Sequence, residues 1–330
     1  MERREFILWL IAAGLIPLEL VGCGSKSPDG SEGDNVSAYE PKANPAANPP
    51  AGPAGTGGAG ARGIGASKLV VANGSDPETL LDKGFAAMGG IAAWVRKGDV
   101  VAIKPNFSVP VAPDSGAVTD PRLVAGLVRR CLAQGAKEVK VIDYPFTNPA
   151  MCLERTGIKT AVEAAGGRLI VPSTLNDKFY RQVSLKGPHL KTAYFSYDVL
   201  EADLFISFPI LKHHGSTKLT MSLKNMMGLV WNRQALHSSN LDASIPELTA
   251  FKQPHLIIMD AIRGITEKGP RGPGNIREYN QLIFGTDPVA VDAYGAELFG
   301  LKPTDVRHLK AAADMGLGQI DWGKLPLVKA

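Results

Sequence analysis

The segment Asp203–Asn225 reads DLFISFPILKHHGSTKLTMSLKN and contains the strongest fold signal in the chain. Its first part, Leu204–Phe208, is an uninterrupted apolar run, which is typical of a strand buried on both faces of a parallel sheet. Pro209 ends the run, and the segment closes on Lys224-Asn225. The loop between them is rich in cationic and hydroxyl side chains: Lys212, His213, His214, Ser216, Thr217 and Lys218. Open α/β sheets place ligand sites at the carboxyl ends of buried strands, so we expect a binding site after Phe208.

Strand-like and helix-like segments alternate on both sides of this segment. Apolar runs predict strands at 69–72, 99–103, 138–142, 169–171, 182–185, 204–208 and 256–259. Helices are predicted at 77–95, 121–134 and 149–165, and two more begin at Asp287-Pro288 and at Pro303. Such alternation is typical of an α/β domain whose mostly parallel sheet carries helices on both faces. We also expect an antiparallel excursion around residues 168–198.

Polar side chains follow four of the predicted strands at the point where each strand ends. They are Lys104 and Asn106 after 99–103, Asp143 after 138–142, Lys212, His213 and His214 after 204–208, and Asp260 after 256–259. The carboxyl ends of parallel strands meet at one edge of a sheet, so these side chains should gather in one crevice. Lysine side chains bind phosphate or carboxylate as point charges. The sequence therefore predicts an anion-receptive crevice that also holds acid/base groups.

Candidate roles follow from these residue types. Catalytic candidates are His214, as an acid/base group with Asp143 or Asp260, and Lys212. The candidates for ligand binding are Lys104, Asn106, His213, Lys218, Lys224 and Asn225. Each has a structural alternative, because the aspartates can equally cap loops and Lys104 can be a solvated surface lysine.

The histidines and cysteines do not show the spacing of a dedicated metal site. Neighbouring histidines on an extended segment point to opposite sides, so we favour His214 for the crevice and give His213 a role in the fold. No H-x-H or H-E-x-x-H pattern occurs, and His214 is at most an occasional metal ligand. With three cysteines in all, the chain has too few for a four-cysteine zinc or iron–sulfur site. Cys131 and Cys152 fit a pair of buried free thiols, with a disulfide as the alternative.

Residues 1–23 resemble a bacterial export signal. Arg3-Arg4 precedes Phe6 and an apolar run to Leu20, as in twin-arginine signals, and the run ends at Cys23 like a lipobox. The alternative is a transmembrane anchor, for which the run falls short of the ~20 residues that span a bilayer. We therefore expect handling by the twin-arginine translocase and by lipoprotein-processing enzymes. Lipidated Cys23 would then hold the protein on the periplasmic side of a bacterial membrane.

Composition separates the rest of the chain into a tether and a folded domain. Residues 24–66 are rich in Gly, Pro, Ala, Ser and Asn, which predicts a disordered tether. Residues 67–330 form the single α/β domain. The net charge of +4 is small and unclustered, so the chain does not have the character of a nucleic-acid-binding protein.

Several short motifs, taken together, resemble the bacterial and archaeal domain-of-unknown-function family 362 over roughly Ser67–Gly318. They are Lys104-Pro105-Asn106, Asp203–His214, Lys224–Gly228, Asp260-Ala261-Ile262 and Asp287–Ala293. The resemblance implies a fold and site positions but no reaction. Many members carry a ferredoxin-like domain, which implies redox partners. This chain lacks such a domain, so any electrons would come from a separate protein. A more distant similarity to the lactate racemase fold is an analogy of fold alone.

These observations predict an envelope protein that binds an anionic ligand or cofactor in the Lys/His/Asp crevice, with or without catalysis. The alternative is a non-enzymatic redox accessory or an assembly module for an envelope complex. The sequence identifies no cofactor, and it excludes an iron–sulfur cluster held by this chain alone.

Overall fold

The structure, a computed structural model, describes residues 62–63, 67–231, 233–238 and 240–330. All of these residues belong to one compact unit. The predicted export signal, with Arg3, Arg4 and Cys23, lies outside the described residues, as does nearly all of the predicted tether. Arg62, at the end of that tether, pairs with Asp99, and Arg62 Nη1 donates to Trp94 O at 2.8 Å.

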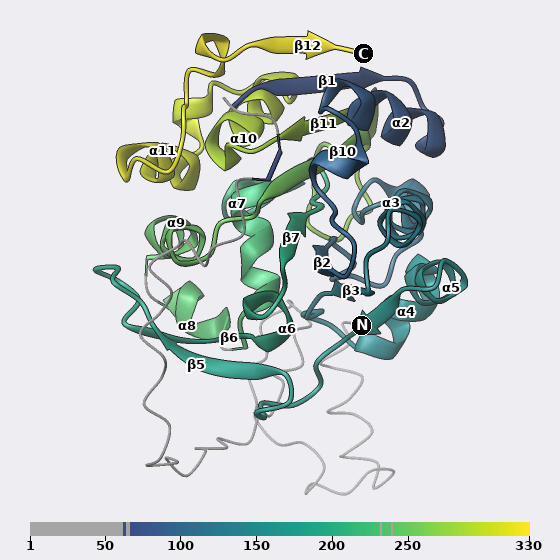
Figure 1. Ribbon diagram of the computed structural model, residues 1–330. Coiled ribbons are helices and arrows are strands. Elements are labelled where there is room, and N and C mark those ends of the chain that lie inside the picture. Colours follow the sequence, from purple (N-terminus) through teal and green to yellow (C-terminus); the bar gives the residue numbers. More distant parts are fainter. Residues whose placement is uncertain (1–61, 64–66, 232, 239) are drawn as a thin grey trace, which may run out of the picture. The chain divides into compact units, whose positions relative to one another are not determined.

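Within the described ranges, an eight-stranded sheet forms the centre of the domain (Figure 1). The strand order is β12-β1-β11-β10-β7-β2-β3-β4. The strands are β1 (Leu69–Asn73), β2 (Val100–Lys104), β3 (Glu138–Ile142), β4 (Arg168–Ile170), β7 (Leu204–Ser207), β10 (Leu256–Ile265), β11 (Ile276–Gly285) and β12 (Leu327–Lys329). Neighbours from β10 to β4 pair in parallel, whereas β11 is antiparallel to both β10 and β1. The predicted fold class, a mostly parallel α/β sheet, is confirmed.

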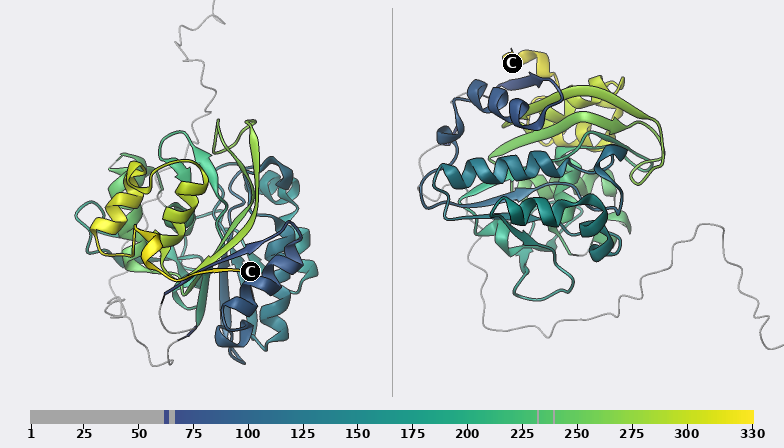
Figure 2. Two further views of the ribbon diagram at one scale, coloured as in Figure 1. Left: turned by 90° about the horizontal axis from the view of Figure 1, so that it is seen from above. Right: turned by 90° about the vertical axis from the view of Figure 1, so that its right-hand side faces the viewer.

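Helices cover both faces of this sheet because its strands are apolar on both sides. On β7, Leu204 and Ile206 pack in a core with α2 (Pro77–Ala87), α3 (Pro121–Ala133) and α5 (Ile158–Ala164). Phe205, between them, packs in the opposite core with α7 (Ser222–Asn225), α9 (Leu241–Phe251), α10 (Pro288–Leu298) and α11 (Arg307–Asp314). Figure 2 shows the two helical layers on opposite sides of the sheet. This alternation follows from the two-residue period of a strand.

Local sequence signals set several helix boundaries. Asp120 caps α3 by accepting from Arg122 N, and Asp287 caps α10 by accepting from Val289 N and Ala290 N. The helix predicted at 149–165 is divided into α4 (Pro149–Thr156) and α5, because Gly157 between them has φ 68°. The helix predicted at 77–95 ends earlier, and a 3₁₀ turn η2 (Ile91–Ala93) follows it.

The antiparallel excursion is present as a separate hairpin of β5 (Tyr180–Ser184) and β6 (Thr192–Ser196). A second short hairpin, β8 (Lys212–His214) with β9 (Lys218–Thr220), occupies the predicted cationic loop. β11 was not predicted, because the first half of this strand is largely polar and exposed. The remaining short elements are α6 (Tyr197–Leu200), α8 (Arg233–Ser238), η3 (Pro113–Ser115), η4 (Met226–Leu229), η5 (Pro303–Asp305) and η6 (Trp322–Lys324).

Two further predictions concern cysteines and membrane spans. Cys131 in α3 and Cys152 in α4 are buried free thiols, as favoured from the sequence. Burial raises the pKa of Cys131 to about 12, which suits a structural thiol. Among the helices that the structure describes, none has the length and hydropathy to cross a bilayer.

Candidate functional site

A buried ion pair lies at the carboxyl edge of the parallel strands. Lys104, the last residue of β2, places Nζ 2.9 Å from Asp143 Oδ1, directly after β3. The lysine also donates to Asn225 Oδ1 at 2.9 Å, and Asn225 Nδ2 returns a bond to Lys104 O. Asp143 accepts from Phe107 N, Ser108 Oγ and Tyr144 N. Every oxygen of this carboxylate is therefore committed to the fold.

Gly228 allows η4 to lie directly on the ion pair. A Cβ atom at this position would lie within 2.5 Å of Lys104 Cε and closer still to Asp143 Oδ1. Gly228 O also accepts from Tyr144 N at 3.2 Å. Only a residue without a side chain permits this approach.

Lys212, in contrast, is a buried cation without an anionic partner. Its Nζ donates to Asn106 Oδ1 at 3.1 Å, Ala117 O at 2.6 Å and Pro270 O at 3.4 Å. Among the described residues it forms no ion pair. Burial, together with the charge of Lys224, lowers the pKa of Lys212 to about 7, while Asp143 opposes the change.

Further basic side chains lie near Lys212 at the same edge. Burial lowers the pKa of Lys224 to about 8, with a contribution from Arg233. Burial also lowers the pKa of His214 to about 2, together with the charges of Lys224 and Lys212. His214 is therefore neutral at physiological pH. In the part of the chain that the structure describes, none of these four side chains forms an ion pair with a carboxylate. The edge thus carries uncompensated positive charge.

The expected partnership of His214 with Asp143 or Asp260 is not formed. His214 Nδ1 accepts from Ser216 N, inside its own hairpin. Asp260 accepts from Asp120 N at 2.9 Å and Ile262 N at 3.1 Å, and burial raises its pKa to about 7. Asp143 and Asp260 therefore accept hydrogen bonds from loop backbones, which is the alternative role predicted from the sequence.

The other predicted site residues divide between the edge and the surface. Asn106 bonds Lys212, and Asn225 bonds Lys104, so both asparagines hold lysines. His213 is half-buried and accepts from Gly269 N at 3.0 Å, which ties the β8–β9 hairpin to the β10–β11 connection. Lys218 is exposed at the hairpin turn, with φ 63°, opposite His214.

Arg233 is a part of this site that the sequence did not indicate. Its Nη1 donates to Tyr144 O at 2.6 Å and its Nη2 to Pro145 O at 3.0 Å, and its guanidinium lies 4.2 Å from the Tyr144 ring centre. Tyr144 also stacks on Trp231. The residue follows no strand, so the strand-end rule could not have found it.

Among the described residues, no three histidine, cysteine, aspartate or glutamate side chains lie close enough together to hold a metal ion. The arrangement instead offers several nitrogen donors to an anion, together with one lysine, Lys212, whose pKa lies near neutrality.

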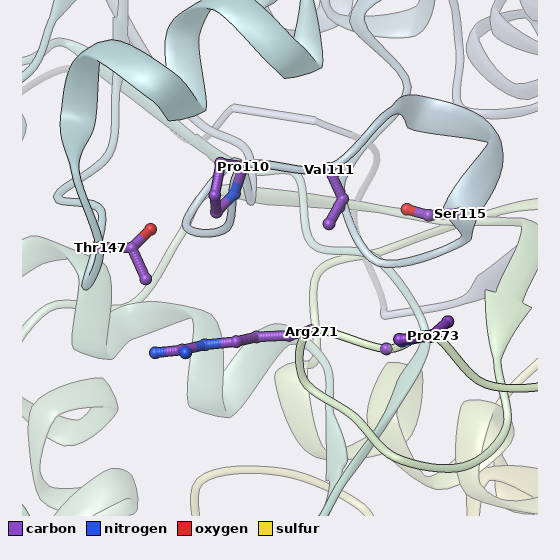
Figure 3. A pocket seen from close by; sticks show the side chains of 7 residues that line it. Pro110, Val111, Ser115, Thr147, Arg271 and Pro273 are labelled. Carbon is purple, nitrogen blue, oxygen red and sulfur yellow. The ribbon is translucent and has the colours of Figure 1, made fainter. Parts of the chain in front are cut away.

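A pocket of about 300 Å³ lies next to this edge (Figure 3). It is lined by Pro110, Val111, Ser115, Thr147, Arg271, Gly272 and Pro273. Its wall is connected to the buried cluster, because Thr147 Oγ1 donates to Ser108 O and Pro270 O accepts from Lys212.

Comparisons with known proteins agree with the motifs. A curated relative, "Thylakoid-associated protein sll1697" from Synechocystis sp., is 26% identical over 246 residues, which cover 70% of this chain and 72% of the relative. The lactate racemase apoprotein from Thermoanaerobacterium thermosaccharolyticum matches with a TM-score of 0.45 at 13% identity, over 69% of this chain and 56% of that one. A Thermotoga maritima protein matches with a TM-score of 0.36 at 13% identity, over 77% of this chain and 60% of that one. This chain thus spans less than two thirds of either solved structure.

The family described as "Domain of unknown function (DUF362)" matches residues 101–297. This range is more than half of the chain, and it contains Lys104, Asp143, Lys212, Lys224 and Asp260. The resemblance inferred from the motifs is thereby confirmed. The chain belongs to the DUF362 family.

Proposed function

We propose that this protein binds a small anionic ligand at the carboxyl edge of its parallel sheet, against Lys224, His214 and Arg233. The observation that carries this proposal is the buried charge of Lys212, whose three bonded partners are all neutral oxygens. Asp143 acts on Lys212 without a direct bond, because that carboxylate is bonded to Lys104 and to three donors of the loops. A buried charge without a counter-charge is costly, and a bound anion would offset that cost.

Three half-buried side chains, two cations and the neutral His214, are the groups that would contact the ligand. Among the residues that the structure describes, Lys224 Nζ has a sulfur atom, Met227 Sδ at 3.6 Å, as its bonded partner, so its N–H groups can donate to an anion. His214 and Arg233 are also half-buried and can be reached from solvent. Lys212 lies beneath them, and its pKa near 7 suits it, better than His214, to exchange a proton with a bound ligand.

The test is calorimetric titration of the full chain with inorganic phosphate, pyrophosphate and citrate. We expect saturable binding that Lys224→Met weakens by about tenfold, since a charge-assisted hydrogen bond is lost. Lys218→Met is the matched control, because this lysine is exposed on the β8–β9 hairpin opposite His214 and is not one of the proposed contacts, so its loss should leave the affinity nearly unchanged.

Two results would contradict the proposal. One is the absence of saturable binding for all three anions, which would favour the alternative role as an accessory or assembly module. The other is an equal loss of affinity in Lys224→Met and Lys218→Met, which would indicate diffuse surface attraction.

We also propose that the protein acts in the bacterial cell envelope, anchored by a lipid on Cys23. Support comes from the arginine pair, the apolar run and the cysteine of residues 1–23, and from the relative's name as a thylakoid-associated protein. In a bacterium with a twin-arginine pathway, Arg3→Lys combined with Arg4→Lys should block export. Cys23→Ser should release the exported protein from the membrane fraction, while Ser25→Ala should not. Membrane retention of the Cys23→Ser protein would refute the lipid anchor.

A further inference from the structure

The pocket in Figure 3 has a polar end and an apolar end. Three separate segments form it: the loop after β2 gives Pro110, Val111 and Ser115, the loop after β3 gives Thr147, and the β10–β11 connection gives Arg271–Pro273. In the figure, the Arg271 side chain extends across the pocket, with its guanidinium on the side of Thr147. Val111 and Pro273 lie toward the opposite side, where Ser115 adds a hydroxyl group. A ligand that fits this shape has one charged end and an apolar body.

The guanidinium of Arg271 has no anionic partner. The guanidinium lies over the Phe146 ring, 5.1 Å from the ring centre, and within the described residues it forms no ion pair. The backbone around it is held in place, since Pro270 O accepts from Lys212 and Gly272 N donates to Lys268 O at 3.0 Å. Arg271 is therefore an open cation on an anchored loop.

The opposite wall of the pocket is anchored as well. Thr147 Oγ1 donates to Ser108 O and lies 3.1 Å from Cys152 Sγ. Ser115 Oγ accepts from Ala117 N, and the carbonyl of Ala117 accepts from Lys212. Binding at a site that is formed in advance costs less ordering entropy than binding at a mobile one.

We propose that this pocket binds a small organic acid, with its carboxylate on Arg271 and its apolar body against Pro110, Val111 and Pro273. The planar fork of a guanidinium matches a carboxylate with two parallel hydrogen bonds. The apolar walls exclude water from the body of the ligand. A volume of about 300 Å³ is at the lower limit of ligand pockets, so it suits a small acid and not a nucleotide.

This site is separate from the anion site proposed above. Its lining includes none of Lys212, Lys224, His214 and Arg233. The inference therefore does not rest on the proposed function, and different variants test the two sites.

The test titrates the full chain with phenylacetate, phenylacetamide and acetate, followed by calorimetry and ligand-observed NMR. Phenylacetate has both the charge and the apolar body, phenylacetamide lacks the charge, and acetate lacks the body. We expect phenylacetate to bind at least about tenfold more tightly than either of the others.

Variants of the pocket should separate charge from shape. Arg271→Met should weaken phenylacetate binding by about tenfold. The control is Arg277→Met, because Arg277 is also exposed and also lies 5.1 Å from an aromatic ring centre, that of Tyr279. Val111→Phe should reduce binding by filling the apolar end, while it leaves the charge of Arg271 in place.

The proposal is overturned if phenylacetate does not bind, or if acetate binds as tightly as phenylacetate. It is also overturned if Arg271→Met and Arg277→Met have the same effect. The two proposed sites are distinguished by exchanging probes: Lys224→Met should leave phenylacetate binding unchanged, and Arg271→Met should leave phosphate binding unchanged. Loss of phenylacetate binding in Lys224→Met would place the acid at the cationic edge and refute the pocket assignment.

Discussion

Two lysines at the same edge of the sheet have the same exposed fraction but opposite surroundings. Lys104 and Lys212 are each 1% exposed. Lys104 Nζ lies 2.9 Å from a carboxylate, whereas Lys212 bonds one amide oxygen and two backbone carbonyls. Burial lowers the pKa of both, but only Lys104 has a bonded carboxylate that opposes the change. The difference teaches that burial alone does not identify a functional lysine, and that its charge partner must be known.

The pair of Lys104 and Asp143 has the features of a structural contact. Both side chains are buried, all their polar atoms are bonded, and Gly228 lies directly on them. Lys212 has the features of a binding or proton-exchanging group, since its charge is left for something else to neutralise. The predictions below test this contrast, from the largest expected effect to the smallest.

Removing the cation of the paired lysine should have the largest effect. Lys104→Met leaves the Asp143 carboxylate buried without its counter-charge, which should lower the free energy of unfolding by about 3–5 kcal/mol. Urea denaturation measures this. Adding Asp143→Asn to the same chain should restore part of the loss, because the uncompensated charge is then gone. A loss below about 1 kcal/mol in the single variant would show that the pair is not structural.

Removing the unpaired lysine should change how stability depends on pH. The pKa of Lys212 is about 7 in the folded protein and lies near 10.5 when unperturbed, so the unfolded state binds more protons between these values. The contribution of Lys212 to stability is thus full above pH 10.5 and is lost as the pH falls toward 7. The free energy of unfolding should therefore rise between pH 7 and 10. Lys212→Met should make this rise smaller by roughly 2–4 kcal/mol, as measured by urea denaturation over that pH range. The exposed Lys137→Met serves as control, and an unchanged slope in Lys212→Met would mean that Lys212 has a hidden counter-charge.

Gly228→Ala tests how closely η4 must approach the ion pair. The new Cβ atom would overlap Lys104 Cε and Asp143 Oδ1, both buried, and should cost about 1–3 kcal/mol of stability. Gly215→Ala is the control, because the nearest atom to a Cβ there, Gly269 O, is 3.8 Å away. Equal thermal stabilities of the two variants would show that the edge can relax around an added methyl group.

Asp260 extends the comparison to a buried anion whose bonded partners are backbone N–H groups. Burial raises its pKa from 3.8 to about 7, so the unfolded state binds fewer protons between these values. Stability from this group is full below pH 3.8 and is lost as the pH rises through about 7. Asp260→Asn should reduce the fall in the free energy of unfolding over this pH range. At low pH the same substitution should lower that free energy by only about 1 kcal/mol. Burial also raises the pKa of Asp292 to about 7. This residue is present in the unsubstituted protein and in Asp260→Asn, so its contribution cancels in the difference between them. A fall that persists unchanged in Asp260→Asn would assign the titration elsewhere.

Much of the fold could be predicted because its strands are buried on both faces. Leu204–Phe208 and Glu138–Ile142 are recognisable as apolar or alternating runs, and the structure has strands at 204–207 and 138–142. β11 could not be predicted, because Ile276–Gln281 is largely exposed and polar and is a strand only through its pairing with β10. The single helix expected at 149–165 was wrong, because Gly157 has a left-handed conformation that ends α4 within that range.

The candidate site shows the same division. Strand ends predicted that Lys104, Asp143 and Lys212 would lie at one edge, and the contacts of these residues place them there. The strand-end rule could not find Arg233, whose place depends on Tyr144 O and Pro145 O in a loop 88 and more residues away. Nor could it find Arg271, because the rule does not show which turns of a glycine- and proline-rich connection face a pocket.

The sequence by itself determined where the buried strands lie, which residues follow them and which residues cap the helices, because these features depend on neighbours along the chain. Only the tertiary structure decided which lysine is neutralised. Asn225 bonds Lys104 across 121 residues, and Asn106 bonds Lys212 across 106. Electrostatic energy depends on the distances between charges and on how deeply they are buried. Neither quantity can be determined from neighbouring positions in the sequence.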